Sequence, residues 1–232
     1  MATPLDFAVL LRDDYPKQIA HGLLTMLELT AVSWLLSMVI GIGLAAVRMS
    51  RSRWGQHGVA LYVEYHQNVP MLAQIFLWYF GIPSLLPMAT QQWINGHNSE
   101  FVFSAIAIGL CMAAYVSEDL RSGIRAIPNS QLEASRALGL NYLQATRFVV
   151  LPQAIRIAMP ALVSHTVLLF KNTSLAMAIG VAELTYVTRE IESSSFHTVE
   201  VYLFATAAYL AISVLIMFCG ARLEQRLRVA TR

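Results

Sequence analysis

Charged side chains are scarce in this chain of 232 residues. Only 13% of the residues are Asp, Glu, Lys or Arg, whereas 56% are hydrophobic, and the mean hydropathy is +0.55. Soluble domains carry about 25% charged residues. A soluble fold of this length would not bury so much apolar surface and still keep a polar exterior. The composition therefore argues against a soluble enzyme or a nucleic-acid-binding protein and indicates an integral membrane protein.

Lysine is rare among the charged residues. Only Lys17 and Lys171 occur, and neither follows a glycine. The chain therefore lacks a GxxxxGK[ST] loop, in which the lysine contacts nucleotide phosphates. This excludes an ATPase of that type. We expect no cofactor in this chain, and any energy that it uses would come from elsewhere.

The two cysteines, Cys111 and Cys219, both lie in apolar stretches, so a disulfide framework is not expected. The histidines show no metal-ligand spacing with them. His165 follows Ser164 directly, but neighbouring residues of a helix point in different directions, which argues against a serine–histidine hydrolase. A catalytic site is therefore not expected.

Long hydrophobic runs are the dominant feature that is present. A transmembrane helix needs about 20 predominantly apolar residues, and five stretches meet this length. They cover residues 22–47, 59–80, 101–120, 154–179 and 201–221. The expected fold is a single all-α integral membrane domain of residues 1–232 with five transmembrane helices. Pro70 and Pro160 interrupt two stretches, which we expect inside the bundle, where neighbouring helices can satisfy the freed carbonyls.

The distribution of charge between the connections predicts the orientation. Cytoplasmic loops carry an excess of Lys and Arg. One set of connections carries eleven cations, and the opposite set carries three cations with eight acids. We therefore expect the N-terminus outside and the C-terminus inside. The eleven cations are Arg48, Arg51, Arg53, Arg121, Arg125, Arg136, Arg147, Arg222, Arg226, Arg228 and Arg232.

The longest cytoplasmic connection, residues 121–152, has the pattern of two short helices. Ser130 and Glu133 have the S-x-x-E spacing of a capping box. Gly139 fits the left-handed residue that ends a helix, and Asn141 offers a second N-cap with a glutamine three residues later. The expected exposed face mixes leucine and alanine with arginine, which favours binding of a partner.

This connection resembles the EAA loop of the membrane subunits of ABC importers. Glu133 and Ala134 are followed by Ser135, where a second alanine is usual, and Gly139 stands six residues after the glutamate. A Leu-Pro pair closes the motif. In that family the loop docks in a groove of the ATP-binding subunit. The resemblance therefore implies that the ATPase-coupling residues are Glu133, Ala134, Ser135, Arg136, Gly139, Leu151 and Pro152.

Other segments are similar to permeases of type I ABC importers for polar amino acids. They comprise residues 68–74, 114–124, 151–156 and 171–175. Gln67 stands where that family usually has an arginine. Residues 68–81 most resemble glutamate/aspartate permeases, so the resemblance implies import of glutamate or aspartate. Glutamine or cationic amino acids transported by the same mechanism are the alternative.

The same resemblance implies the partners and the compartment. We expect two ATP-binding ABC subunits, a second permease subunit and a periplasmic amino-acid-binding protein, in a bacterial inner membrane. A heterodimer of permeases is expected, and a homodimer is left open. No nucleic-acid partner is expected, because the pI of 8.6 reflects cations gathered at one membrane face.

Lys171 is the first candidate for the substrate path. A central lysine costs about 2.5–3.5 kcal/mol to insert into a membrane. Ser164, Lys171 and Ser174 share one helical face, which would suit a carboxylate. The alternative is a structural ion pair with Glu118 or another intramembrane acid. Asn172 and Thr173 extend the polar stretch, although both could simply bond between helices.

Tyr115 and Glu118 are three residues apart and share a face of the third stretch. Glu118 could bind the ammonium group of a substrate, or it could form an ion pair with Arg121 one turn later. The expected substrate path comprises Lys171, Asn172, Thr173, Ser174, Glu118, Tyr115, Pro70 and Gln74.

Two other classes of membrane protein fit the sequence less well. A secondary transporter driven by an ion gradient through Glu118 and Lys171 would normally have more helices, arranged as internal repeats. No repeat is visible in the sequence. A membrane enzyme would need a nucleophile or a metal cluster, and neither is recognised. We therefore expect a transport subunit without catalytic activity of its own.

Overall fold

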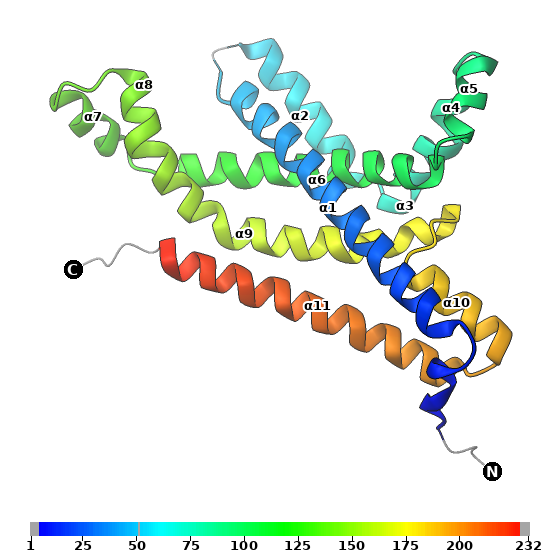
Figure 1. The fold of residues 1–232 in the computed structure, drawn as a ribbon. Helices are drawn as coiled ribbons and strands as arrows, with labels where there is room; N and C mark the ends of the chain where they lie inside the picture. Colours follow the sequence, from blue (N-terminus) through cyan, green and yellow to red (C-terminus); the bar gives the residue numbers. More distant parts are fainter. Residues whose placement is uncertain (1–4, 51, 228–232) are drawn as a thin grey trace.

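The computed structural model describes residues 5–50 and 52–227 as a bundle of helices (Figure 1). Four helices in this part of the chain are long and apolar enough to cross a membrane. Two of them are α1 (Tyr15–Arg48) and α6 (Ser99–Arg125). The others are built on α9 (Leu151–Asn172) and α11 (Thr198–Leu227). Arg51, Arg228 and Arg232, used above for the orientation, lie outside the described residues.

Shorter helices connect and extend these four. Their bounds are η1 Phe7–Leu11, α2 Arg53–Asn68, α3 Met71–Phe76, η2 Leu77–Gly81, α4 Ile82–Ser84, α5 Met88–Asn95, α7 Asn129–Ala137, α8 Tyr142–Ala145, η3 Thr146–Val150, η4 Thr173–Ile179 and α10 Leu184–Ser195. Strands are absent from the described ranges.

Helix α6 is the centre of the bundle and packs against α1, α2, α3 and α9. In its most apolar stretch 67% of the residues are buried, against 17–28% for the other three long helices. Small residues allow this packing. A Cβ atom on Gly123 would lie only 2.5 Å from the carbonyl oxygen of Ala154 in α9. Helix–helix packing in membranes relies on such small residues, so the sequence of α6 fits its central position.

The apolar stretch 59–80 does not form one helix. Helix α2 ends at Asn68 and α3 begins at Met71, with Val69 and Pro70 in extended conformation between them. Proline has no N–H and disfavours a helical residue before it. Helix α3 then continues through η2 and α4 as an apolar helix of residues 71–84. The stretch is thus interrupted at Pro70, as its proline predicted, and it forms a broken apolar segment beside the four long helices of the described residues.

Pro160, the other proline in an apolar stretch, does not break its helix. Helix α9 continues through Pro160 without a break, packed against α6 and α11. It changes character at its other end, where the α-helix stops at Asn172 and a 3₁₀ helix, η4, follows. Gly180, with a φ of +94°, ends this segment. Thr173 and Ser174 therefore lie on the tighter helix.

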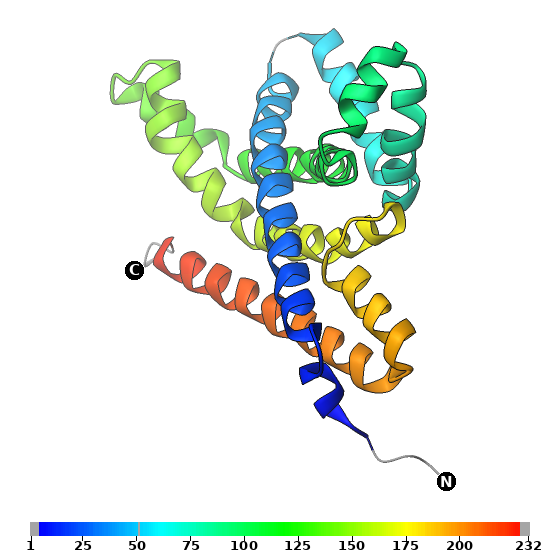
Figure 2. The same cartoon turned by 45° about the vertical axis from the view of Figure 1, so that its right-hand side comes forward.

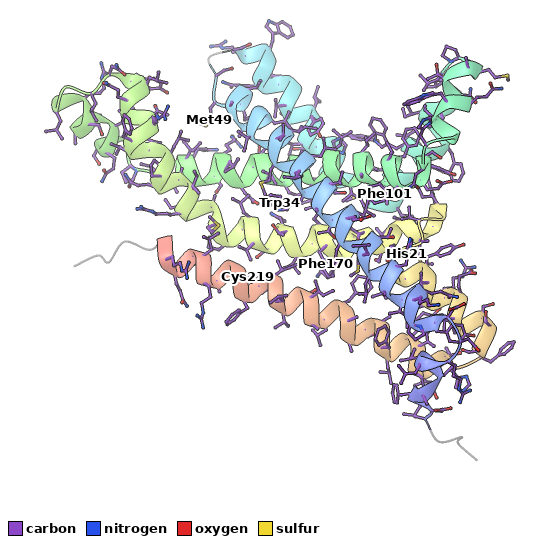
Figure 3. All side chains as sticks on the ribbon, viewed as in Figure 1. His21, Trp34, Met49, Phe101, Phe170 and Cys219 are labelled. Atoms are coloured by element: carbon purple, nitrogen blue, oxygen red, sulfur yellow. The ribbon has the colours of Figure 1, made fainter. Side chains whose placement is uncertain are left out.

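The two ends of the bundle differ in composition. Helices α7 and α8 and the C-terminal part of α11 lie at one end, whereas η1, α5 and α10 lie toward the other (Figures 1 and 2). Figure 3 shows Trp34 and Phe170 between helices, with Met49 and His21 toward opposite ends of α1. The arginines of α7 and of the last turn of α11 are thus at one end.

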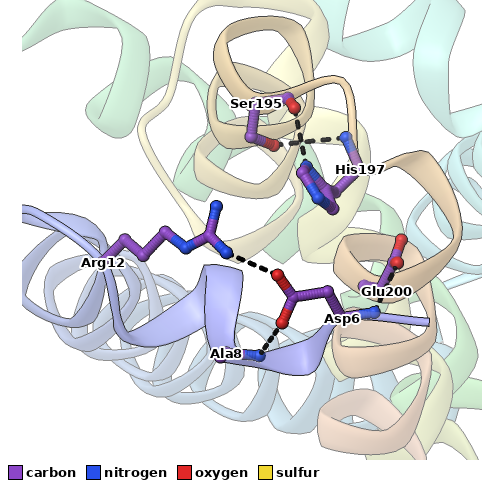
Figure 4. A network of polar contacts seen from close by, with 6 residues as sticks. All are labelled: Asp6, Ala8, Arg12, Ser195, His197 and Glu200. Atoms are coloured by element: carbon purple, nitrogen blue, oxygen red, sulfur yellow. Dashed lines mark hydrogen bonds and ion pairs between the residues drawn. The ribbon is translucent and has the colours of Figure 1, made fainter. Parts of the chain in front are cut away.

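A polar network fixes the N-terminal segment to the start of α11 (Figure 4). The backbone N–H of Asp6 donates to Glu200 Oε1 at 2.9 Å. The Asp6 carboxylate in turn accepts from the backbone N–H of Ala8 at 3.0 Å and pairs with Arg12. The first described residues are therefore part of the packed structure.

Candidate coupling loop and translocation path

The first cytoplasmic helix is not capped as expected. Helix α7 begins at Asn129, and Pro128 occupies the N-cap position without a side-chain cap bond. Ser130 therefore lies inside the first turn, and the capping box with Glu133 does not form. The reason is that Pro128 starts the helix two residues earlier than the serine would. Glu133 is exposed and has no side-chain partner among the described residues.

The end of α7 is formed as predicted. Gly139 has a φ of +87°. Its N–H donates to the carbonyl of Arg136 at 2.9 Å, and the N–H of Leu140 donates to the carbonyl of Ser135 at 3.2 Å. These two bonds form a Schellman motif, which requires a left-handed residue where the helix ends. An added Cβ on Gly139 would meet nothing within 4 Å, so the demand for glycine is conformational.

The second expected cap is also confirmed, but its helix is not short. The Asn141 side chain accepts from the N–H of Gln144 at 2.9 Å, and the Gln144 side chain accepts from the N–H of Asn141 at 3.0 Å. Helix α8 then continues through the π-type turn η3 into α9, forming one helix over Tyr142–Ile179. The prediction of two separate short helices was therefore wrong: α7 is separate, whereas α8 is the first turn of a long helix.

The proline of the Leu-Pro pair explains the π-type turn. Pro152 has no N–H to donate to the carbonyl of Phe148, and η3 ends directly before Leu151. A wider turn accommodates a missing helical hydrogen bond. Leu151 and Pro152 thus lie where the α8 end of the long helix joins its membrane part.

The surface of this region is unusually apolar for an exposed segment. Leu138, Tyr142, Leu143 and Phe148 are between 65% and 85% exposed. Arg136 and Arg147 are exposed beside them, as expected. We call this set of six residues the coupling face. An exposed apolar patch with charged residues around it is typical of a protein-binding surface. The sequence pattern missed the three aromatic and leucine residues of α8 and η3.

Among the residues predicted to line the substrate path, Glu118 forms the local ion pair rather than a pair with Lys171. Its Oε2 accepts from Arg121 Nη1 at 2.7 Å, and its Oε1 lies 3.8 Å from Arg48 Nε. The two arginines neutralise the half-buried carboxylate. The second contact also joins the end of α1 to α6, which the sequence did not predict.

Lys171 lies in the last turn of α9 with its side chain exposed and without a hydrogen bond or ion pair to the described residues. Ser164 is exposed on the same helix, and the Ser174 hydroxyl donates to the carbonyl of Lys171 at 2.8 Å. Thr173 points inward: it is fully buried and donates to the carbonyl of Phe170 at 2.7 Å. Asn172 is half-buried.

Gln74 spans the break at Pro70. Its side chain is 1% exposed, its Nε2 donates to the carbonyls of Val69 and His66 at 2.8 and 3.1 Å, and its Oε1 lies 2.6 Å from His66 Nδ1. A broken helix leaves carbonyls that other groups must satisfy. This arrangement gives Gln74 a structural role and leaves its N–H groups no hydrogen for a substrate.

A pair that the sequence did not reveal lies beside Tyr115. His165 Nδ1 of α9 is 2.6 Å from Asp119 Oδ2 of α6, and the rings of Tyr115 and His165 are 4.9 Å apart. The signal was present, since an acid inside a membrane stretch normally has a partner. Tyr115, Glu118 and the Asp119–His165 pair therefore lie together. Lys171 lies six residues beyond His165, about 9 Å along the helix.

Metal-binding clusters of three or more His, Cys, Asp or Glu side chains do not occur in the part of the chain that the structure describes.

Comparison with known proteins identifies the family. Residues 37–229 match the model of the binding-protein-dependent transport system inner membrane component family. The chain belongs to this family. The resemblance to permeases of polar amino-acid type I ABC importers is therefore confirmed, and the chain is a multi-pass membrane transport subunit.

Curated relatives and a solved structure agree with this family. The glutamate/aspartate import permease protein GltJ of Escherichia coli (strain K12) is 32% identical over 90% of this chain and 86% of its own length. The nopaline transport system permease protein NocM of Agrobacterium fabrum is 34% identical over 89% and 86%. A chain from the crystal structure of an amino acid ABC transporter with histidines has a TM-score of 0.83 and 27% identity, with 97% of this chain and all of that chain covered.

Proposed function

We propose that this family member is the permease subunit of an ATP-driven, binding-protein-dependent importer of polar amino acids, with glutamate or aspartate as its substrate. The observation that carries the proposal is the family match over residues 37–229 together with the geometry of the coupling face. The likeness to GltJ supports the acidic substrate. The nopaline permease is equally similar, so glutamine, cationic amino acids or opine-like substrates are the competing candidates.

The proposed assembly places the coupling face against ATPase subunits. Two ATP-binding subunits would hydrolyse ATP with Mg²⁺, and a second permease and a periplasmic amino-acid-binding protein would complete the transporter. The end of the bundle that carries α7 and α8 would face the cytoplasm of a bacterial inner membrane, with the N-terminus outside. The gathering of arginines near that end supports this orientation.

The proposed mechanism uses the continuity of α8 with α9. A docked ATPase subunit would move the coupling face, and one helix over Tyr142–Ile179 links that face with Lys171. Alternating access would then follow from tilting of this helix against α6. Its contacts with α6 include the Asp119–His165 pair, which would maintain the relative register of the two helices.

In this mechanism Lys171 is the best candidate for a substrate carboxylate. It is a cation without a side-chain partner among the described residues, and it lies on an apolar helix. Glu118, by contrast, is neutralised by Arg48 and Arg121. We assign Glu118, with Arg48 and Arg121, to an ion cluster at the cytoplasmic end of the substrate path. Tyr115 would line the wall of that path.

Co-purification from native membranes, followed by uptake in proteoliposomes, tests this function. We expect ATP-binding subunits to co-purify, and we expect uptake of labelled glutamate or aspartate to need internal ATP and the binding protein. A panel containing glutamine, arginine and nopaline identifies the substrate. Uptake driven by an imposed ion gradient without ATP would contradict the proposal and favour a secondary transporter.

A further inference from the structure

The segment between Glu64 and Glu100 contains no charged residue. Residues 65–99, 35 in all, include none of the chain's Asp, Glu, Lys or Arg side chains. They include helices α3, η2 and α4, the turn at residues 85–87, and α5. A connection that faces water normally carries charge, as the N-terminal segment and α10 of this chain do. The missing charge therefore needs a physical explanation.

The segment from Ile82 to Asn95, the α4–α5 elbow, has a defined structure. The N–H groups of Leu85 and Leu86 donate to the carbonyls of Ile82 and Pro83 at 3.1 and 3.0 Å. Gln91 Nε2 donates to the carbonyl of Leu86 at 2.9 Å. Figures 1 and 2 show the elbow standing out from the bundle next to the start of α6. Its own hydrogen bonds thus fix the shape of the elbow.

The exposed face of the elbow is apolar. Leu85 is 81% exposed, Met88 73% and Trp93 64%. Leu85 lies in the turn before α5, Met88 is the first residue of α5, and the exposed Ala89 and Trp93 share one face of that helix at i, i+4 spacing. The Trp93 ring stacks on that of His97, with centroids 4.4 Å apart. An elbow of this kind in water would normally turn these side chains inward and its polar side chains outward.

We propose that the α4–α5 elbow is a membrane-surface anchor, and that its Leu85, Met88 and Trp93 enter the interface of the leaflet on the side of η1 and α10. Three observations favour lipid as the occupant. The elbow directly continues the apolar helix of residues 71–84 and so begins near the rim of the bilayer. Tryptophan is enriched at the level of lipid headgroups. The polar residues of α5 include Thr90, Gln91 and Gln92. Because these side chains are neutral, they can enter the lipid–water interface without the cost of dehydrating a charge.

A water-soluble partner is the less fitting occupant. Charged groups toward this end of the molecule include Asp14, Lys17, Arg189 and Glu190 on the N-terminal segment, α1 and α10, and Glu100 in the first turn of α6; none of them lies on the elbow. A soluble partner would have to leave this apolar face in water whenever it dissociates. Lipid covers the face permanently.

Spin labelling in the assembled transporter tests the proposal. Cys219 is exposed and is replaced by serine, whereas Cys111 is buried and stays. Single cysteines then replace Leu85 or Met88. The spin-labelled transporter is reconstituted into vesicles of phosphatidylethanolamine and phosphatidylglycerol. Collision rates with oxygen, which concentrates in lipid, and with a water-soluble nickel chelate are then measured. Leu210→Cys on exposed α11 is the lipid reference, and Glu190→Cys on exposed α10 is the aqueous reference.

We expect labels at residues 85 and 88 to show a higher oxygen than nickel collision rate, as at residue 210 and opposite to residue 190. Rates like those at residue 190 would overturn the proposal by placing the elbow in water. Low rates with both reagents would also overturn it, because a second permease or another subunit would then cover the face. A second measurement needs no cysteine: brominated lipids should quench less tryptophan fluorescence in Trp93→Phe, and an unchanged quenched fraction would contradict the anchor.

Discussion

Asp119 of α6 and His165 of α9 are joined by a hydrogen bond of 2.6 Å inside the bundle. The two residues are 46 positions apart in sequence, and the bond links the central helix to the helix that carries the coupling face. Tyr115 packs on the imidazole ring. The pair thus connects the two parts of the molecule that transport would move against each other.

Removal of either partner of this pair should destabilise the transporter. Asp119→Leu or His165→Leu should each lower the free energy of unfolding by about 1–3 kcal/mol, because the remaining polar group loses its partner in a half-buried place. The double variant should cost less than the sum of the two. Thermal unfolding in detergent measures all three variants. Strictly additive losses would show that the two residues are not coupled.

Gly139→Ala and Gly139→Asp should uncouple transport without preventing insertion. A side chain at a φ of +87° costs roughly 1–2 kcal/mol in backbone strain, which distorts the Schellman motif at the end of α7. We expect normal amounts of permease in the membrane and loss of ATP-driven uptake. Gly43→Ala is the matched control, because an added Cβ there also meets nothing within 4 Å, in ordinary helix. Normal uptake by both Gly139 variants would exclude a need for this geometry.

Lys171→Met should weaken substrate transport through loss of a carboxylate partner. We expect KM to rise roughly tenfold, which corresponds to about 1.4 kcal/mol, and Lys171→Arg to retain more of the affinity. Ile157→Ala, also exposed on α9 and in no candidate site, controls for a general disturbance of that helix. Uptake kinetics in proteoliposomes distinguish the variants. If Lys171→Met keeps the wild-type KM and substrate ranking, Lys171 does not bind substrate.

Gln74→Leu should be far more harmful than Gln67→Leu. The first change leaves the carbonyl of Val69 without its donor and the carbonyl of His66 with only the Cys111 thiol, at a cost of about 1–3 kcal/mol for a buried group. Gln67 is exposed, so its replacement should leave the melting temperature nearly unchanged. Equal effects of the two substitutions would refute the bridging role of Gln74.

Glu183 should make the stability depend on pH. Its carboxylate caps α10, accepting from the N–H groups of Thr185 and Tyr186 at 2.9 Å, and burial raises its pKa above the usual value of 4.5. Because the folded state favours the protonated form, this contribution to stability is complete below pH 4.5. It is lost as the pH rises through the raised pKa.

Glu183→Gln removes the titrating group, so the decline in stability above pH 4.5 should become smaller in the variant. Glu190→Gln, exposed on the same helix, should keep the wild-type profile. Melting temperatures across the pH range provide the comparison. If the pH profile of Glu183→Gln matches that of the wild type, groups other than Glu183 cause the pH dependence of stability.

Local features of the site could be predicted from sequence because the interacting residues are close along the chain. The Asn141 cap, the left-handed Gly139 and the Glu118–Arg121 pair each span at most three residues. The long helices α1, α6 and α11 follow from apolar length alone.

Features that depend on the arrangement of helices could not be predicted. His165 and Asp119 meet only because α9 crosses α6, and Arg48 reaches Glu118 only because α1 does. Ser130 was expected to cap α7, but Pro128 starts that helix earlier. Pro70 breaks a helix, whereas the packed helix α9 accommodates Pro160. The hydrophobic pattern around the two prolines does not distinguish these outcomes.

The unbroken helix from α8 to η4 fixes angular register as well as length. At a rise of about 1.5 Å per residue, 38 residues span roughly 57 Å, so a tilt of about 5° displaces one end by about 5 Å. Each residue also turns the helix by about 100°. The extra residue held in the π-type turn η3 therefore sets the direction in which Tyr142 and Leu143 face relative to Lys171. Deletion of one residue there would turn the coupling face about a quarter of the way round while the membrane part of the helix stayed in place.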